Sequence, residues 1–227
     1  MTNFVTAQPD PKGTPSKFSF EDFLALQTLA PMVSGFLPWT RFSLRPVALV
    51  SVLVEVIVHE RCRILEMGSG ASTLLLAAAL REQGKGRVIA VEHHPAWAAM
   101  MSRLLGAKGL ARHASVLVAE LAPTSLSLDG SPWYSVDVLG PLLDQEHDLL
   151  LVDGPPAGEG RNMSRAPALP FFESALTDDA LVVLDDIDRP GELAVLQSWE
   201  ASGTWHFERF PELGIAMAST NRPLMHW

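Results

Sequence analysis

The sequence predicts an α/β protein built on a doubly wound, mostly parallel sheet, with helices at its N-terminus and an antiparallel β-hairpin at its C-terminus. Between residues 63 and 185, five short apolar runs alternate with segments of helical periodicity, which is typical of parallel strands joined by helices. The last two strand-like runs, residues 204–210 and 214–220, are only three residues apart, which indicates a hairpin. A length of 227 residues, 48% of them hydrophobic and 19% charged, suits one domain with a full core.

The chain is expected to divide into a tail and one domain. Residues 1–18 carry Pro, Gly and Lys without periodicity and are expected to form a flexible tail. Residues 19–227 contain no repeat and no linker-like stretch, so they are expected to form a single domain. Within it, the helical patterns of residues 19–59 precede the alternating core of residues 60–227.

Apolar periodicity and capping residues predict the individual elements. The second N-terminal helix is expected to begin near Ser43, which would act as its cap, with Pro46 in the first turn. On a later helix Trp97 falls on the apolar face and is expected in the core. Strands are expected at residues 63–67, 87–92, 114–119, 147–153 and 180–185, and helices at residues 20–29, 43–59, 72–82, 95–105, 138–143 and 193–199.

Composition argues against several classes of function. The 17 Lys and Arg against 26 Asp and Glu give a formal net charge of −9, which disfavours binding to nucleic acid or to an anionic membrane. The single cysteine, Cys62, excludes an internal disulfide and a cysteine-rich zinc site, and is expected in the core. The longest apolar run, residues 46–58, contains Glu55 and is shorter than the roughly 20 residues of a membrane span. With no signal-like N-terminus, a soluble, cytoplasmic protein is expected.

The first predicted strand runs into a glycine-containing turn that is typical of nucleotide-binding sites. Gly68 and Gly70, with Ser69 between them and Ser72 beyond, would let a ligand approach backbone N–H groups at the start of a helix. Glu92 ends the second strand, 22 residues after Gly70. A carboxylate at that place can accept hydrogen bonds from the two hydroxyl groups of a ribose.

Glu66 distinguishes between two kinds of nucleoside ligand. Its carboxylate stands two residues before the first glycine, where it would repel the diphosphate of a dinucleotide. Thr73 also occupies the position at which a dinucleotide-binding turn has its third small residue. The turn therefore favours a ligand that carries an ammonium group and a sulfonium.

A second group of acidic residues follows the fourth and fifth predicted strands. Asp153 ends the fourth strand, and Asp185 and Asp186 end the fifth, at the edge of the sheet where ligands bind. Neighbouring carboxylates repel one another unless a cation or a proton intervenes, and Mg²⁺ or Ca²⁺ takes such oxygens as ligands. The alternative interpretation is structural, because aspartates at strand ends often cap turns and Asp188 can pair with Arg189.

The segments ILEMGSGAST (residues 64–73) and VIAVEHH (residues 88–94), together with the terminal hairpin, resemble class I S-adenosylmethionine-dependent methyltransferases over residues 43–220. The resemblance implies a Rossmann-like, seven-stranded sheet. It also implies that the cofactor contacts Glu66, Gly68, Ser69, Gly70, Ser72 and Asp153, with Glu92 on the ribose and His93 beside the adenine.

The VDGPP and LDD segments are similar to metal-dependent O-methyltransferases of the catechol and macrolide-sugar types, and also to a group of uncharacterised bacterial methyltransferases. In the first two families, an acid after strand four and two residues after strand five hold Mg²⁺. Catechol-type enzymes have an Asp-Asn pair after strand five. If Asp186 matches the Asp of that pair, Ile187 stands at the Asn position and one metal ligand is missing. The sugar-type Asp-Asp pair fits better and implies Asp153, Asp185 and Asp186 as metal ligands.

These resemblances imply an enzyme that transfers a methyl group from S-adenosylmethionine to the hydroxyl of a small-molecule acceptor. Asp153 would be catalytic with Mg²⁺ as its cation, and residues 19–59 would form a lid. A methyltransferase that acts on another acceptor without metal stays open, as does a non-catalytic protein of the same fold that binds a nucleoside or a partner. The apolar N-terminal helices are a candidate contact for a homo-oligomer.

Several residues near the predicted site have two interpretations. Arg161 and Arg165 form a basic segment at the mouth of the predicted site. Arg165 and Arg189 can orient an anionic acceptor or pair with the surrounding aspartates, and the second interpretation is favoured. Trp39 and the pair Trp133–Tyr134 are candidates for the wall of the acceptor pocket, although a tryptophan in a loop more often serves packing.

Overall fold

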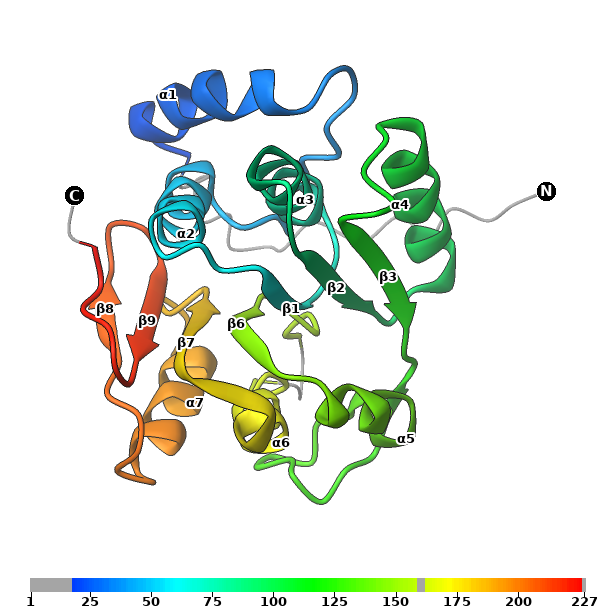
Figure 1. The fold of residues 1–227 in the computed structure, drawn as a ribbon. Coiled ribbons are helices and arrows are strands. Elements are labelled where there is room, and N and C mark those ends of the chain that lie inside the picture. The colour runs from blue at the N-terminus through cyan, green and yellow to red at the C-terminus, as the bar shows by residue number, and fades with distance from the viewer. Residues whose placement is uncertain (1–17, 159–161, 226–227) are drawn as a thin grey trace.

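The computed structural model describes residues 18–158 and 162–225, so the expected tail, apart from Phe18, and Arg161 lie outside the described residues. The central sheet consists of β1 (Arg63–Met67), β2 (Arg87–Glu92), β3 (Ala114–Val118), β6 (His147–Val152), β7 (Leu176–Asp185), β8 (Glu208–Phe210) and β9 (Ile215–Ser219). These seven strands lie in the order β3-β2-β1-β6-β7-β9-β8 (Figure 1). All pairs are parallel except those that involve β9. The predicted sheet and its terminal hairpin are confirmed.

Helices cover both faces of this sheet (Figure 1). The first layer holds α2 (Pro46–Val58), α3 (Ala71–Gln83) and α4 (Pro95–Ala107), and the second holds α5 (Val136–Leu139), α6 (Ala168–Phe172) and α7 (Pro190–Glu200). Alternating residues of β1 face the two layers, so that Ile64 belongs to one core cluster and Leu65 to the other. Short 3₁₀-helices lie at Ala30–Met32, Gly140–Asp144 and Glu173–Ala175. None of the helices in the described part of the chain is long and apolar enough to cross a membrane.

The structure corrects several expected boundaries. The cap of α2 is Arg45 instead of Ser43, whose hydroxyl oxygen accepts a hydrogen bond from the N–H of Thr40 (3.0 Å) and closes a turn ahead of the helix. Cys62 is only partly buried against the first core cluster. β7 begins four residues earlier than expected, since the polar residues near its start conceal the strand pattern in the sequence. The two-residue strands β4 (Leu121–Ala122) and β5 (Trp133–Tyr134) are too short to show periodicity.

A buried carboxylate, that of Asp22 in α1 (Phe20–Leu29), joins the N-terminal segment to the core. Asp22 accepts hydrogen bonds from the N–H of Ser19 (2.9 Å) and of Val47 (3.2 Å). It also pairs with Arg45 at 2.7 Å. Burial by itself would raise the pKa of Asp22, but the Arg45 side chain and the backbone N–H groups outweigh burial and lower it. The ionised carboxylate of α1 therefore holds the start of α2, and the segment between the two helices is fixed at both of its ends.

The order in which strands are added to the sheet reverses between the neighbouring strands β1 and β6. Open α/β sheets bind ligands at such a switch point. The turns after these two strands touch. A Cβ atom on Gly154 would lie 3.1 Å from the carbonyl oxygen of Met67, 3.2 Å from the Cα of Gly68 and 2.5 Å from the hydroxyl of Tyr134. A side chain at position 154 would therefore require the Tyr134 hydroxyl to move and would crowd the backbone at the end of β1.

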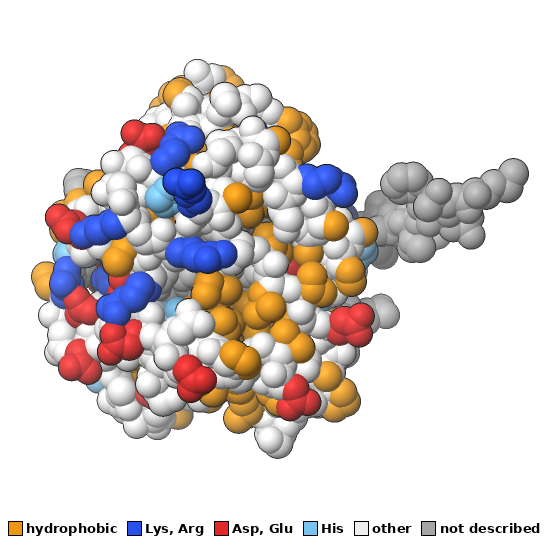
Figure 2. Space-filling model, turned by 45° about the vertical axis from the view of Figure 1, so that its right-hand side comes forward, with side chains coloured by type: hydrophobic (Ala, Val, Ile, Leu, Met, Phe, Trp, Pro, Cys, Tyr) orange, Lys and Arg blue, Asp and Glu red, His pale blue; other side chains and the backbone are white. Residues whose placement is uncertain are grey.

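The surface carries charges of both signs. On the face in Figure 2, basic side chains lie mainly toward the left and are interleaved with acidic ones, while hydrophobic side chains gather nearer the centre.

Replacement of Asp22 by alanine is expected to destabilise the fold by roughly 2 to 4 kcal/mol, because Arg45 would lose its buried partner. The pKa of Asp22 is lowered on folding, so its contribution is present above the unfolded pKa of about 3.9 and is lost as the pH falls through the lower folded value. Denaturant unfolding of the wild type and Asp22→Ala at pH 7 and pH 3 measures both effects. Glu21→Ala, an exposed neighbour, is the control, and an equal loss in both variants would contradict the assignment.

Replacement of Gly154 by alanine is expected to destabilise the fold by roughly 1 to 3 kcal/mol through overpacking at the switch point. Because the nearest atom is the hydroxyl of Tyr134, adding Tyr134→Phe should restore part of the loss. Gly140→Ala is the matched control, since a Cβ there meets no atom within 4 Å. Thermal unfolding of the four proteins tests this, and a Gly154→Ala variant as stable as Gly140→Ala would refute it.

Candidate active site

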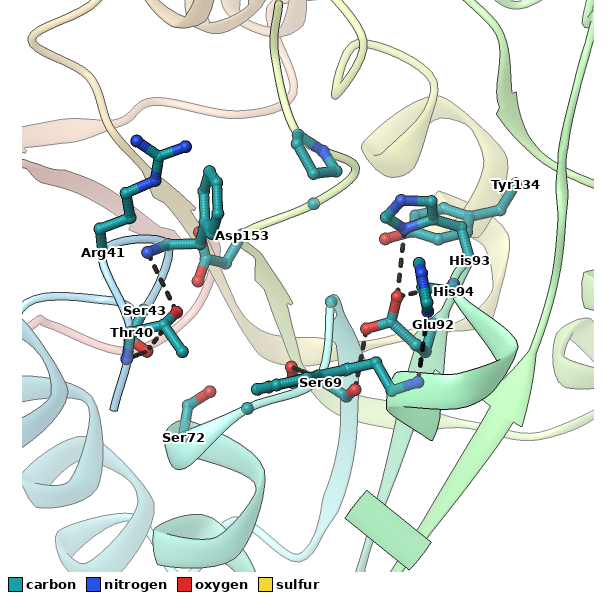
Figure 3. A pocket seen from close by; sticks show the side chains of 16 residues that line it. Thr40, Arg41, Ser43, Ser69, Ser72, Glu92, His93, His94, Tyr134 and Asp153 are labelled. Carbon is teal, nitrogen blue, oxygen red and sulfur yellow. Dashed lines mark hydrogen bonds and ion pairs between the residues drawn. The ribbon is translucent and has the colours of Figure 1, made fainter. Parts of the chain in front are cut away.

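A cavity of about 470 Å³ opens at the carboxyl ends of β1, β2 and β6 (Figure 3). Its wall is formed by the turns after these three strands, the start of α3, Trp97 of α4, Tyr134 of β5 and the segment of residues 40–43 ahead of α2. A volume of this size lies within the range of small-molecule sites in proteins. The cavity lies at the switch point, as the sequence predicts.

The glycine turn after β1 forms the floor of the cavity. Gly68 has a φ of +103°, a conformation that L side chains rarely adopt, and its N–H donates to the carbonyl of Val91 (2.9 Å). The N–H of Gly70 donates to the hydroxyl oxygen of Thr73 (3.0 Å), and α3 begins at Ala71. The positive end of the α3 dipole therefore opens onto the cavity.

Glu66 lies beneath this turn and is not part of the cavity wall. Its carboxylate accepts hydrogen bonds from the hydroxyl groups of Ser72 and Thr73, the latter at 2.6 Å. Burial raises the pKa of Glu66 to about 7, although these hydrogen bonds oppose the rise. The structure thus separates Glu66 from the other predicted cofactor residues, and the geometry supports a role in holding the turn. Sequence spacing shows that Glu66 is near the turn but not that the hydroxyls of α3 cover it.

Glu92 lies at the end of β2 and faces the cavity (Figure 3). Its oxygens accept hydrogen bonds from the hydroxyl of Ser69 (2.9 Å) and the N–H of His94 (2.9 Å), and the ring of His93 lies 3.1 Å away. Burial would raise the pKa of Glu92, but the hydrogen bonds from His93, His94 and Ser69 outweigh it and lower the pKa. Glu92 is therefore an ionised acceptor, which is what ribose hydroxyl groups need.

Trp97 and Tyr134 are aromatic side chains of the cavity wall. Trp97 is partly buried against the first core cluster, as expected, and its indole N–H also donates to the carbonyl of Ser69 (2.8 Å). Tyr134 is almost fully buried at the cavity wall, and its hydroxyl has no hydrogen-bond partner among the described residues. An unpartnered buried hydroxyl beside a cavity indicates a polar ligand atom.

The other predicted pocket aromatics lie elsewhere. Trp133 is buried in the second core cluster, where its ring contacts Phe171 and Phe172, and Trp39 packs against the first cluster. The segment of residues 40–43 was expected only as part of a lid, yet it supplies four residues of the wall. The polar and aromatic residues of this segment show no periodicity, so the sequence pattern does not predict that they line the cavity.

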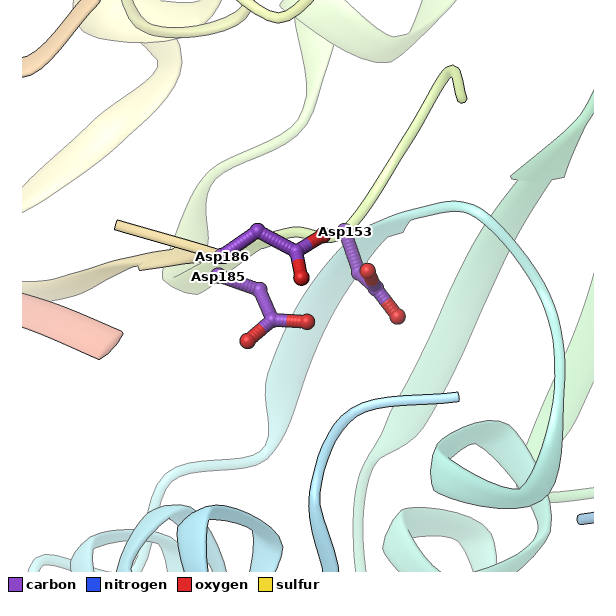
Figure 4. A group of neighbouring side chains, drawn as sticks. All are labelled: Asp153, Asp185 and Asp186. Atoms are coloured by element: carbon purple, nitrogen blue, oxygen red, sulfur yellow. The ribbon is translucent and has the colours of Figure 1, made fainter. Parts of the chain in front are cut away.

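Asp153, Asp185 and Asp186 lie together, as their strand-end positions predict (Figure 4). One carboxylate oxygen of each lies within 4.8 Å of the others. Burial and mutual repulsion raise the pKa of Asp153 and of Asp185. Of the three, only Asp153 lines the cavity.

Arg165 fills the space behind these carboxylates and is 3% exposed. Its guanidinium lies 2.8 Å from an oxygen of Asp186 and 3.4 Å from one of Asp153, and it donates to the carbonyl of Asp185 (2.9 Å). Arg189 contacts the same oxygen of Asp186 at 2.7 Å. The interpretation of Arg165 and Arg189 as partners of the aspartates is confirmed.

The acidic cluster retains an excess of carboxyl groups over arginines. Glu192, which is also buried, lies 3.9 Å from Arg165 and 3.8 Å from Arg189, so four carboxyl groups meet two guanidinium groups. Burial raises the pKa of Glu192 as well. Groups with raised pKa values hold protons that a divalent cation can replace, and oxygen donors suit Mg²⁺. The donor set of Asp153, Asp185 and Asp186 therefore fits such an ion.

Residues 65–187, more than half of the chain, match the family described as a methyltransferase domain. No curated protein sequence matches the chain. Among solved structures, it is similar to an O-methyltransferase from Bacillus cereus in complex with S-adenosylhomocysteine, with 15% identity, a TM-score of 0.58 and 93% of each chain covered. It is also similar to TomG, an O-methyltransferase of tomaymycin synthesis from Streptomyces achromogenes in complex with S-adenosylmethionine, with 18% identity, a TM-score of 0.54, and 92% of this chain and 91% of that chain covered.

A third similar structure is the S-adenosylhomocysteine-bound methyltransferase PaMTH1 from Podospora anserina, with 16% identity, a TM-score of 0.56, and 92% of this chain and 90% of that chain covered. At these identities the structural likeness shows a shared fold, and the family match covers both strand ends that carry the acidic residues. The chain therefore belongs to the methyltransferase-domain family, as its resemblance to class I S-adenosylmethionine-dependent methyltransferases predicts.

Proposed function

We propose that the protein transfers a methyl group from S-adenosylmethionine to a hydroxyl group of a small molecule. The observation that carries the proposal is that one cavity joins the ionised Glu92, suited to a ribose, with Asp153, suited to an acceptor hydroxyl. S-Adenosylmethionine supplies a methyl group on a sulfonium, which is positively charged and suits an acidic wall. The net charge of −9 favours a small acceptor over a nucleic acid.

The donor would bind along the floor of the cavity. Gly68 and Gly70 would let its methionine part approach the start of α3, and Glu92 would accept hydrogen bonds from both ribose hydroxyls. His93 and Tyr134, whose ring centres are 6.3 Å apart, would lie beside the adenine. Trp97 would hold the turn in place through its hydrogen bond to Ser69. These contacts orient the reactive methyl without covalent chemistry by the protein.

The acceptor would bind at the other end, next to Asp153. This side chain is the member of the acidic cluster that reaches the cavity, so it would orient the acceptor hydroxyl and take its proton. The protein would align the oxygen, the methyl carbon and the sulfur in one line, which is where its contribution to the rate lies.

Mg²⁺ would be held by Asp153, Asp185 and Asp186, and it supplies positive charge that lowers the pKa of an acceptor hydroxyl. A second candidate is the same transfer without a metal. The contact of Arg165 with Asp153 and Asp186 favours this alternative, because a guanidinium already places positive charge at the cluster.

Isothermal titration calorimetry with S-adenosylhomocysteine tests the proposed donor site. The wild type is expected to bind, and Glu92→Gln should weaken binding by about 10- to 100-fold through loss of charged hydrogen bonds to the ribose. Glu120→Gln, at an exposed acid just after β3, should bind like the wild type. No binding by the wild type would refute the methyltransferase proposal and leave a non-catalytic protein of the same fold.

Metal dependence is tested by thermal unfolding and by methyl transfer after treatment with EDTA. Mg²⁺ at about 100 times its Kd should stabilise the wild type by about 2.7 kcal/mol, a rise of several degrees in Tm, and should restore activity. Asp185→Asn should lose this rise, whereas Asp178→Asn, at an exposed acid of β7, should keep it. Full activity in EDTA would favour the metal-independent alternative.

A further inference from the structure

Arg41 is a positively charged side chain in the wall of the cavity. It lines the cavity together with Glu92 and Asp153. Those two carboxylates already have partners, Glu92 in Ser69 and His94 and Asp153 in Arg165. Within residues 18–158 and 162–225, the Arg41 guanidinium has no hydrogen bond or carboxylate partner, and its contact is with the ring of Phe42, 4.7 Å from its centre. Its charge is therefore available to a ligand.

The segment that carries Arg41 is preorganised. The N–H of Thr40 donates to the hydroxyl of Ser43 (3.0 Å), and the N–H of Phe42 donates to the hydroxyl of Thr40 (3.2 Å). Arg45, just beyond, is fixed by Asp22 and by the carbonyl of Glu212 (2.6 Å). The backbone that carries Arg41 is therefore already ordered, so that an anion bound there has to immobilise only the side chain.

The direction of the side chain separates Arg41 from the donor end of the cavity. In Figure 3, Arg41 lies on the side of Asp153, across the cavity from Glu92 and His93, and extends away from Ser72 and the glycine turn. Arg165, by contrast, is buried against carboxylates and does not line the cavity. Arg41 thus meets the acceptor end, where Phe42, 63% exposed, also offers a ring face.

We propose that Arg41 selects the acceptor, and that the acceptor is a planar hydroxylated molecule with an anionic group such as a carboxylate. The guanidinium binds the anion, Phe42 packs against the planar part, and the hydroxyl points toward Asp153. This inference rests on the proposed function, since it names the substrate class of the same site.

The test is calorimetry on protein loaded with S-adenosylhomocysteine, with 3,4-dihydroxybenzoate and its neutral amide as matched probes. The wild type is expected to prefer the acid by about 10-fold or more, and Arg41→Gln should abolish the preference. Arg41→Lys should keep part of it because the charge remains, and Arg103→Gln, at an exposed arginine of α4 outside the cavity wall, should keep all of it. Melting temperatures verify that each variant folds.

A second arm locates the anion. Arg41→Gln should bind S-adenosylhomocysteine and 5′-methylthioadenosine, which lacks the amino-acid end, with the wild-type ratio of affinities. A selective loss of S-adenosylhomocysteine binding would assign Arg41 to the carboxylate of the cofactor and overturn the acceptor assignment. A wild type that binds S-adenosylhomocysteine without preferring the acid would overturn this inference alone, whereas one that binds no S-adenosylhomocysteine would overturn the proposed function and this inference with it.

Discussion

The close contact of two strand ends, at Gly68 after β1 and Gly154 after β6, is the constraint on which the site depends. This is the switch point of the strand order, and a Cβ atom at position 154 would crowd the backbone of β1 and the hydroxyl of Tyr134. This contact sets the separation between the glycine turn, which leads to α3, and Asp153, which leads to the acidic cluster. In the proposed reaction, a donor and an acceptor bound on the two sides of this contact would meet in one cavity.

The acidic residues around this contact have different environments and different roles. Glu66 is buried under the turn with a raised pKa, whereas Glu92 is ionised at the wall of the cavity, and the difference arises from hydrogen-bond donors that outweigh burial only at Glu92. The cluster at Asp153, Asp185 and Asp186 is stabilised from behind by Arg165, so that its charge is partly balanced without blocking the cavity. Arg41 contributes positive charge on the same side of the cavity as Asp153, across from Glu92, and the proposed acceptor end therefore carries both signs.

The sequence predicted the fold and the location of the site more fully than the composition of its wall. Strand alternation determined the sheet, and residues at strand ends, such as Glu92 and Asp153, could be placed because parallel strands bring their carboxyl ends together. Trp97 packs against the core, as its apolar spacing predicts, but that spacing does not show that the indole also reaches the cavity wall. Tyr134, which the sequence offers as a candidate for the pocket wall, does line the cavity from β5. Arg41 lies on an irregular segment, and its position depends on long-range contacts, such as the Asp22–Arg45 pair, that no local pattern encodes.

The most direct test of the account is a crystal structure of the protein with S-adenosylhomocysteine and Mg²⁺. The account predicts the ligand in the cavity between the two strand ends, with its ribose hydroxyls on Glu92, its sulfur directed toward Asp153, and density for an ion among Asp153, Asp185 and Asp186. Absence of the ion alone would support the metal-independent form of the reaction. A ligand bound outside this cavity, or with its ribose away from Glu92, would contradict the central claim.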